Sequence, residues 1–202
     1  MAIEITKPNL LVVEGREEEL FFGAIVRDLG LQDIQVIGIG GKMNLRRNLR
    51  ALTLSPCFTE VVSLGVVRDA NDNPSAAFQS VHDALQAVNL PAPGRSLMPT
   101  GDVPQVTVMI LPEEGMRGML EDLCLKSVAK DSAMVCVTQY FECLQQRGLS
   151  LPENLSKATV QVFLASRRRA GLRLGEAAQA GYWLWDDDAF RQVRDFLQQI
   201  GS

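Results

Sequence analysis

Short apolar runs typical of strands alternate with amphipathic, helix-like segments along the first 111 residues. The apolar runs occupy residues 10–13, 34–39, 60–67 and 106–111. Between them, apolar residues recur at the three-to-four-residue spacing that predicts helices, over residues 17–29, 45–52 and 74–88. Strands that alternate with helices indicate βαβ units. The sequence therefore predicts an α/β fold with a mainly parallel, four-stranded sheet flanked by helices.

The strand signal fades after Pro112, and the rest of the chain is predicted to be helical. Apolar periodicity favours helices over residues 116–125, 132–146, 155–166 and 189–200. We expect a single domain over residues 1–202, in which a helical C-terminal part (112–202) completes an α/β core (1–111). The Pro- and Gly-rich segment 90–104 is long enough to be a lid or a binding loop.

Composition narrows the classes of function. A net charge of −4 argues against broad, charge-driven coating of nucleic acid, although it leaves room for a local basic groove. The four cysteines form no CxxC pair and the chain has one histidine, so a zinc site is disfavoured. No apolar run approaches the ~18 residues of a membrane span, and the first residues do not resemble a signal peptide. We expect a soluble, cytoplasmic protein that does not contact a membrane.

Carboxylates follow two of the predicted strands. Glu14 comes directly after the first strand, and Asp69 and Asp72 follow the third. The carboxyl ends of parallel strands meet at one edge of a sheet, where ligands bind. A hard cation such as Mg²⁺ prefers oxygen ligands and would relieve the repulsion between such carboxylates, so the sequence predicts a metal site there.

Asn71 and Glu18 extend this predicted site. In an extended segment Asn71 would share a side with Asp69 and offer a neutral carbonyl oxygen. Another interpretation is a turn before Pro74, because Asp and Asn are common turn residues. Glu18 lies one helical turn after Glu14 and can face the same crevice. Alternatively, the acids at 17–19 only stabilise the positive end of a helix dipole.

A glycine-rich turn follows the second predicted strand. The segment Gly38-Ile39-Gly40-Gly41-Lys42 lacks the GxGxxG spacing of a dinucleotide site and the Ser or Thr of a P-loop. We interpret it as a tight strand-to-helix turn. As an alternative, Lys42 and nearby backbone N–H groups would hold a phosphate.

Several stretches spread over nearly the full length carry a resemblance to known proteins. They are Val13–Glu19, Gly40-Gly41-Lys42, Asp69–Asp72, Ile110-Leu111-Pro112, Gly118–Asp122, Lys157-Ala158 and Leu174–Ala178. The Val-Glu-Gly of the first strand, the acid four residues after that Glu and the Asp-centred third strand resemble the Toprim catalytic domain of topoisomerases, primases and overcoming-lysogenization-defect (OLD) nucleases. The whole chain resembles a small bacterial Toprim-like family of unknown function. The resemblance implies a Toprim-like Rossmannoid fold.

The resemblance also implies a role for each acidic position near the strand ends. Glu14 would be a metal ligand or a general acid/base, and Asp69 would be the first Asp of the DxD motif and a Mg²⁺ ligand. Asn71 falls on the second Asp of that motif and departs from it. Asp72 would then substitute for the missing acid through a small backbone shift.

Three further residues match positions of nuclease-type Toprim sites. Glu18 corresponds to an additional acid and Glu121 to a later acid, both as metal ligands. Lys157 resembles a lysine that would stabilise charge at the transferring phosphate. The resemblance thus implies a Mg²⁺ or Mn²⁺ cofactor. It leads to the hypothesis of a nuclease or phosphoryl-transfer enzyme acting on phosphodiesters of DNA or RNA.

Two alternatives remain open at this stage. The chain could be a non-catalytic Toprim-like module that binds a nucleotide, a nucleic acid or a protein partner, an interpretation that Asn71 and the acidic charge balance favour. Separately, the apolar stripe of the last predicted helix (189–200) could mediate a homodimer, although such stripes more often pack in the core.

Overall fold

The computed structural model describes residues 4–41 and 44–201 and contains a four-stranded parallel sheet at its centre. The strand order is β2-β1-β3-β4, and every neighbouring pair runs parallel. The strands are β1 (Asn9–Val13), β2 (Ile34–Gly38), β3 (Ser63–Asp69) and β4 (Gln105–Leu111). The predicted α/β class and the parallel, four-stranded sheet are confirmed.

The helices follow the prediction closely, with three differences. They are α1 (Arg16–Asp28), α2 (Leu45–Thr53), α3 (Pro74–Gln86), α4 (Leu120–Ser127), α5 (Ala133–Gln146), α6 (Leu155–Ala165), α7 (Leu174–Gln179) and α8 (Arg191–Ile200). The short α7 was not predicted, because six residues give little periodicity. The predicted third strand begins later, at Ser63, and a short 3₁₀ helix at Pro56–Glu60 takes its first residue. A second short 3₁₀ helix, Asp188–Phe190, replaces the first residues of the predicted last helix.

The start of α4 lies at Leu120 rather than at the predicted Met116. The preceding loop contains Gly118, whose φ of 131° is accessible mainly to glycine. Its backbone pairs with Asn71 in both directions: the Asn71 N–H donates to the Gly118 carbonyl (2.7 Å), and the Gly118 N–H donates to the Asn71 carbonyl (2.8 Å). This short bridge ties the end of β3 to the start of α4, and so it delays the helix.

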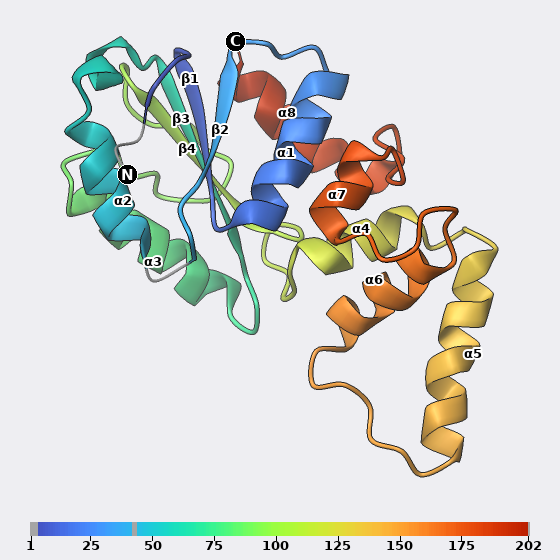
Figure 1. The fold of residues 1–202 in the computed structure, drawn as a ribbon. Coiled ribbons are helices and arrows are strands. Elements are labelled where there is room, and N and C mark those ends of the chain that lie inside the picture. Colours follow the sequence, from blue (N-terminus) through green and yellow to red (C-terminus); the bar gives the residue numbers. More distant parts are fainter. Residues whose placement is uncertain (1–3, 42–43, 202) are drawn as a thin grey trace.

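Helices cover both faces of the sheet (Figure 1). Alternate strand residues such as Leu10, Val12 and Leu64 pack with α2 and α3 in one buried cluster. The intervening residues, such as Leu11 and Val67, pack in a second cluster that includes α1 and α8. This alternation follows from the two-residue period of a strand, and near-continuous apolar strands are expected when both faces are buried.

A glycine lets α8 lie directly on the sheet. A Cβ atom on Gly65 would stand 2.2 Å from Cδ1 of Ile200 and 3.1 Å from the Phe196 ring, so no other residue fits there without movement. Ser63 Oγ also donates a hydrogen bond to the Ile200 carbonyl at 2.6 Å. The apolar stripe of the last helix is therefore part of the core, and it is not exposed for the dimerisation considered above.

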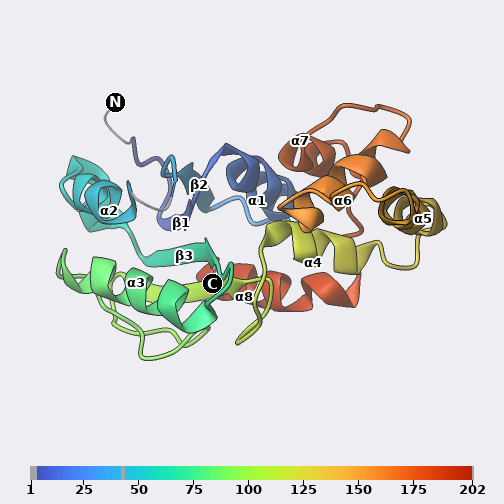
Figure 2. The ribbon, with the colours of Figure 1, turned by 90° about the horizontal axis from the view of Figure 1, so that it is seen from below.

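The C-terminal helices share the cluster of α1 (Figure 2). Buried residues of α4, α5, α6 and α7 belong to the same cluster as Phe21 and Ile25, and α5 lies farthest from the sheet (Figure 1). The predicted lid segment instead lies along the β4 edge: the Leu97 N–H donates to the Val108 carbonyl at 2.8 Å, and Thr100 bridges Val106. Within the described residues, no helix is long and apolar enough to cross a membrane.

Candidate metal centre

Four acidic side chains from three segments gather at the carboxyl edge of the sheet. Glu14 follows β1, Glu18 lies in the first turn of α1, Asp69 ends β3 and Glu121 lies in the first turn of α4. We call these four residues the acidic centre. All four were predicted from the sequence or from the family resemblance, and the structure brings them close enough to act on one another electrostatically.

The pKa of the Asp69 carboxyl shows this crowding most directly. Burial raises the pKa of its carboxyl well above the ordinary value, and the negative charges of Glu14, Glu18 and Glu121 raise it further. The Leu120 N–H donates to Asp69 Oδ1 at 3.0 Å, which acts in the opposite direction because it stabilises the carboxylate. Asp69 is thus surrounded by like charges that a bound cation would neutralise.

Glu121 of the acidic centre pairs with Lys157 of α6. Burial raises the pKa of Glu121 above its ordinary value, and the charge of Glu18 adds to this, whereas the Lys157 ammonium lowers it. Lys157 Nζ stands 3.9 Å from Glu121 Oε1, and its side chain is mostly exposed. Asn154 Oδ1 accepts the Lys157 N–H at 2.9 Å and caps α6, so the helix start holds this lysine near the acids.

Asp122 connects the two helices that carry these groups, and the sequence analysis did not single it out. Its Oδ2 accepts the Met119 N–H at 2.8 Å at the start of α4. Its Oδ1 accepts a hydrogen bond from Ser156 Oγ of α6 at 2.5 Å. Asp122 therefore fixes the distance between α4 and α6, and with it the place of Lys157 relative to Glu121.

Arg68 is a second residue that the sequence analysis missed. Its Nε lies 3.7 Å from Glu14 Oε1, and its Nη1 donates to Ser80 Oγ of α3 at 2.8 Å. The β1–β3 register pairs Val12 with Val66, so two residues further along Glu14 lies beside Arg68. An arginine directly before Asp69 is visible in the sequence, but its contact with Glu14 depends on this register, which a single sequence does not reveal.

Asn71 and Asp72 line one pocket with Asp69, but they do not continue the extended segment that the sequence suggested. Asn71 has φ of 49°, which breaks the extended alternation that would have aligned it with Asp69. Its Nδ2 instead donates to the Asp69 carbonyl oxygen at 3.4 Å. Asp72 is exposed and lines a neighbouring groove of about 460 Å³ with Asp122 and Ser156.

The turn that was the alternative interpretation is present: the Asn73 N–H donates to the Ala70 carbonyl at 3.1 Å, so Asn71 and Asp72 are its central residues. Asn73 Oδ1 accepts the Ala76 N–H at 2.9 Å and caps α3 directly before Pro74. Two of the acids near Glu18 also have structural contacts: Glu17 Oε2 accepts the Gly175 N–H at 2.9 Å, and Glu19 pairs with Arg16 at 2.9 Å. Lys42, the alternative phosphate ligand, lies outside the described residues.

The donor chemistry of the acidic centre fits a hard divalent cation. Carboxylate oxygens are the ligands that Mg²⁺ and Mn²⁺ prefer, and soft or imidazole donors are not needed. Across residues 4–41 and 44–201, no three acidic, histidine or cysteine side chains stand in ligating positions around one point. Side chains of the centre would have to rotate toward a shared ion.

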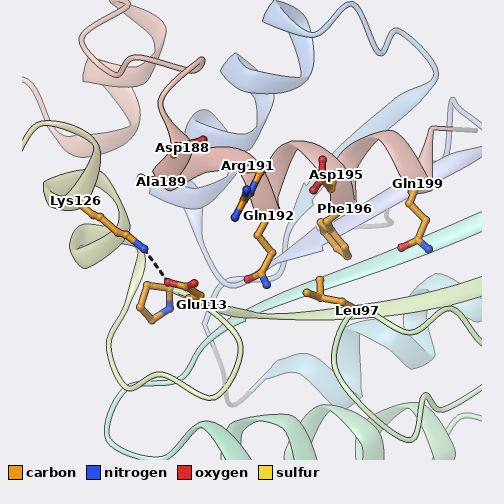
Figure 3. A pocket seen from close by; sticks show the side chains of 11 residues that line it. Leu97, Glu113, Lys126, Asp188, Ala189, Arg191, Gln192, Asp195, Phe196 and Gln199 are labelled. Atoms are coloured by element: carbon orange, nitrogen blue, oxygen red, sulfur yellow. Dashed lines mark hydrogen bonds and ion pairs between the residues drawn. The ribbon is translucent and has the colours of Figure 1, made fainter.

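A sizeable cavity lies away from the acidic centre (Figure 3). It has a volume of about 560 Å³ and lies between α8, the end of β4 and the loop at Leu97. Charged residues line it, including Arg191 and Asp195, and Lys126 Nζ pairs with Glu113 Oε2 at 2.8 Å across its wall. None of the four carboxylates of the acidic centre lines this cavity, so cavity size and acidic crowding identify different places.

Comparisons with known proteins place the chain in a family. It belongs to the family described as "Protein of unknown function (DUF3226)", whose model matches residues 8–202, and this confirms the resemblance of nearly the whole chain to a small family of unknown function. Among solved structures, it is similar to the C-terminal region of the Burkholderia pseudomallei OLD protein, with 14% identity and a TM-score of 0.49 over 98% of this chain and 100% of that chain. The search of curated proteins found no match.

Proposed function

We propose that this protein is a Mg²⁺- or Mn²⁺-dependent hydrolase of nucleic-acid phosphodiesters, and that the acidic centre is its active site. The observation that carries the proposal is the crowding of Glu14, Glu18 and Glu121 around Asp69, which raises the pKa of the Asp69 carboxyl. Strongly perturbed acids at the carboxyl edge of a parallel sheet are typical of functional sites. The Toprim resemblance of the same residues supports the choice of phosphodiester chemistry.

In this proposal, the acidic residues hold the cation and Lys157 stabilises charge on the phosphate. Glu14 and Asp69 end adjacent strands and would hold the cation, with Glu18 and Glu121 as further oxygen ligands. The bound cation would supply Lewis-acid stabilisation of the attacking and leaving oxygens. Lys157 would contribute positive charge beside the phosphate, where negative charge grows in the transition state. Its mostly exposed ammonium stands 3.9 Å from Glu121 Oε1.

Charge explains why a cation is part of the proposal. A phosphodiester is negative, and the acidic centre would repel it if its carboxylates stayed ionised without a counter-ion. A divalent cation reverses the sign of the local charge and so permits the substrate to approach. Asp122 and the bridge between Asn71 and Gly118 contribute indirectly, because they fix α4 and α6 against the end of β3.

Nicking of supercoiled plasmid DNA with Mg²⁺ or Mn²⁺ tests the proposal. Asp69→Asn and Glu14→Gln keep the size of each side chain, and each is expected to lower the rate by on the order of a hundredfold or more. Glu19→Gln is the matched control, since Glu19 pairs with Arg16 on the surface of α1 and should leave the rate unchanged. Equal rates for wild type, Asp69→Asn and Glu14→Gln would contradict the proposal.

A second candidate function is that of a non-catalytic module that binds a nucleotide, a nucleic acid or a protein. One observation favours it: the Arg68 guanidinium already contributes positive charge beside Glu14. Calorimetric titration with Mn²⁺ separates the two functions. Heat of binding that is lost in Asp69→Asn supports the hydrolase, whereas no binding at millimolar Mn²⁺ supports the non-catalytic module.

A further inference from the structure

Arg68 brings a positive charge into the acidic centre from the α3 side of the sheet. Its side chain is only 14% exposed and that of Glu14 only 19%, so the two opposite charges face each other with little water between them. Arginine side chains keep their positive charge in proteins. The acidic centre therefore contains its own cation, next to the residue proposed as its first metal ligand.

The contact between Arg68 and Glu14 is a contact of charges at a distance too long for a hydrogen bond. The 3.7 Å between Nε and Oε1 exceeds the 2.7–2.9 Å of a charge-assisted hydrogen bond. Arg68 Nε is buried and has no hydrogen-bond partner among the described residues. A buried donor without a partner is costly, so the guanidinium is not held at Glu14 by the bidentate geometry that arginine usually forms with a carboxylate.

The other end of the guanidinium has a firm anchor on α3. Nη1 donates to Ser80 Oγ at 2.8 Å. Arg68 also lines a small open pocket of about 230 Å³ together with Asp69, Asp72 and Ala76. The side chain thus has both a hydrogen-bond acceptor and free space besides its contact with Glu14.

We propose that Arg68 is the resident counter-ion of the acidic centre and competes with the divalent cation for the Glu14 carboxylate. The inference rests on the proposed metal-dependent function and adds a control on it. When a cation binds Glu14, charge repulsion displaces the Arg68 guanidinium toward Ser80 and the adjoining pocket. Arg68 therefore stabilises the metal-free protein and weakens metal affinity, and it acts as a positioning residue for Glu14.

Calorimetric titration of metal-free protein with Mn²⁺ tests the inference without any activity assay. Arg68→Gln and Arg68→Met both remove the charge, and each is expected to bind Mn²⁺ on the order of tenfold more tightly than wild type, because one positive charge near a dication is gone. Arg68→Lys keeps the charge and should stay within about threefold of wild type. Two neutral variants are used so that a folding defect in one still leaves a measurement.

Arg27→Gln is the matched control. It removes the same charge in the last turn of α1, at the opposite end of the helix that begins beside Glu14. That helix has 13 residues, about 20 Å at 1.5 Å per residue, so solvent and salt screen Arg27 from the centre. Its Mn²⁺ affinity should stay within about twofold of wild type.

Thermal unfolding supplies a second measurement. In EDTA, Arg68→Gln should melt below wild type, because the positive charge of Arg68 beside Glu14 is then missing; added Mn²⁺ should raise its melting temperature more than that of wild type. Equal or weaker Mn²⁺ binding by both neutral variants, with binding by wild type intact, would overturn the inference alone. No Mn²⁺ binding by wild type or by any variant would overturn the proposed function itself.

Discussion

The pKa values of acidic residues are shifted in opposite directions in two regions of this molecule. At the carboxyl edge of the sheet, Asp69 is surrounded by other carboxylates, and burial and repulsion raise its pKa. In the helical C-terminal part, Asp131 accepts two hydrogen bonds from the Arg167 guanidinium, at 2.9 and 3.0 Å, and its pKa is lowered. Glu113 has a lowered pKa for a similar reason, because Lys126 donates to it.

The contrast separates acids that stabilise the fold from acids that cost stability. Asp131 and Arg167 join the start of α5 to the end of α6, and Arg167 also covers the Phe163 ring at 4.3 Å from its centroid. Asp69 accepts the Leu120 N–H, but burial and three neighbouring carboxylates oppose its ionised form. Natural proteins keep such destabilising arrangements mainly where function needs them, which is the reason for proposing an active site at Asp69.

The largest expected effect on stability concerns Asp69 itself. Asp69→Asn removes a half-buried charge from a crowd of like charges, so it should raise the free energy of unfolding of the metal-free protein at pH 7 by about 1–2 kcal/mol. Urea denaturation in EDTA measures this. Glu19→Gln, on the surface of the same region, should change the value by less than about 0.5 kcal/mol. A destabilised Asp69→Asn protein would remove the contrast between the two regions.

Arg167 offers the opposite, smaller effect. Arg167→Ala removes the bidentate pair with Asp131 and the contact with the Phe163 ring, so it should lower the free energy of unfolding by about 1 kcal/mol. A double-mutant cycle with Asp131→Asn isolates the ion pair from the ring contact. A coupling energy of zero between the two residues would show that the pairing of Asp131 does not stabilise the fold.

The pH dependence of stability should differ in sign between the regions. The pKa of Asp69 is raised in the folded protein. Its contribution to the free energy of unfolding is therefore fully present below the unfolded-state pKa of about 3.9, and it is lost as pH rises through the folded-state pKa. The folded-state pKa of Asp131 is lowered, so its contribution is present above about 3.9 and is lost as pH falls through the folded pKa.

Urea midpoints of the metal-free protein from pH 3 to pH 8 check both signs. Asp69→Asn should be less destabilised than wild type as pH rises above about 4, and Asp131→Asn should lose less stability than wild type on the acid side. These slopes are the smallest of the expected effects. Parallel pH curves for wild type and both variants would contradict the account of the two regions.

The sequence revealed the parts of the site that depend on strand ends and helix starts. Glu14 and Asp69 were predictable because parallel strands end at a common edge, and Glu18 because it lies one helical turn after Glu14. The apolar strand runs and helix periodicities likewise predicted the sheet and most helices. Glu121 and Lys157 were predicted by resemblance alone, since no local pattern brings α4 and α6 to the end of β3.

The features that the sequence did not reveal depend on register and on single backbone angles. Arg68 meets Glu14 only because β1 and β3 pair with Val12 opposite Val66, and a one-residue shift would move it to the other face. Asn71 leaves the predicted extended segment because its φ is 49°, and the same residue forms the bridge to Gly118. Neither the register nor that bridge has a signature in a single sequence.

An anomalous-scattering crystal structure of the protein with bound Mn²⁺ tests the central claim most directly. The account predicts a peak within coordination distance, about 2.0–2.4 Å, of oxygens from both Glu14 and Asp69, with the Arg68 guanidinium moved toward Ser80. Absence of a peak at the acidic centre, or a peak bound only by Asp72 or Asp122 in the neighbouring groove, would contradict it.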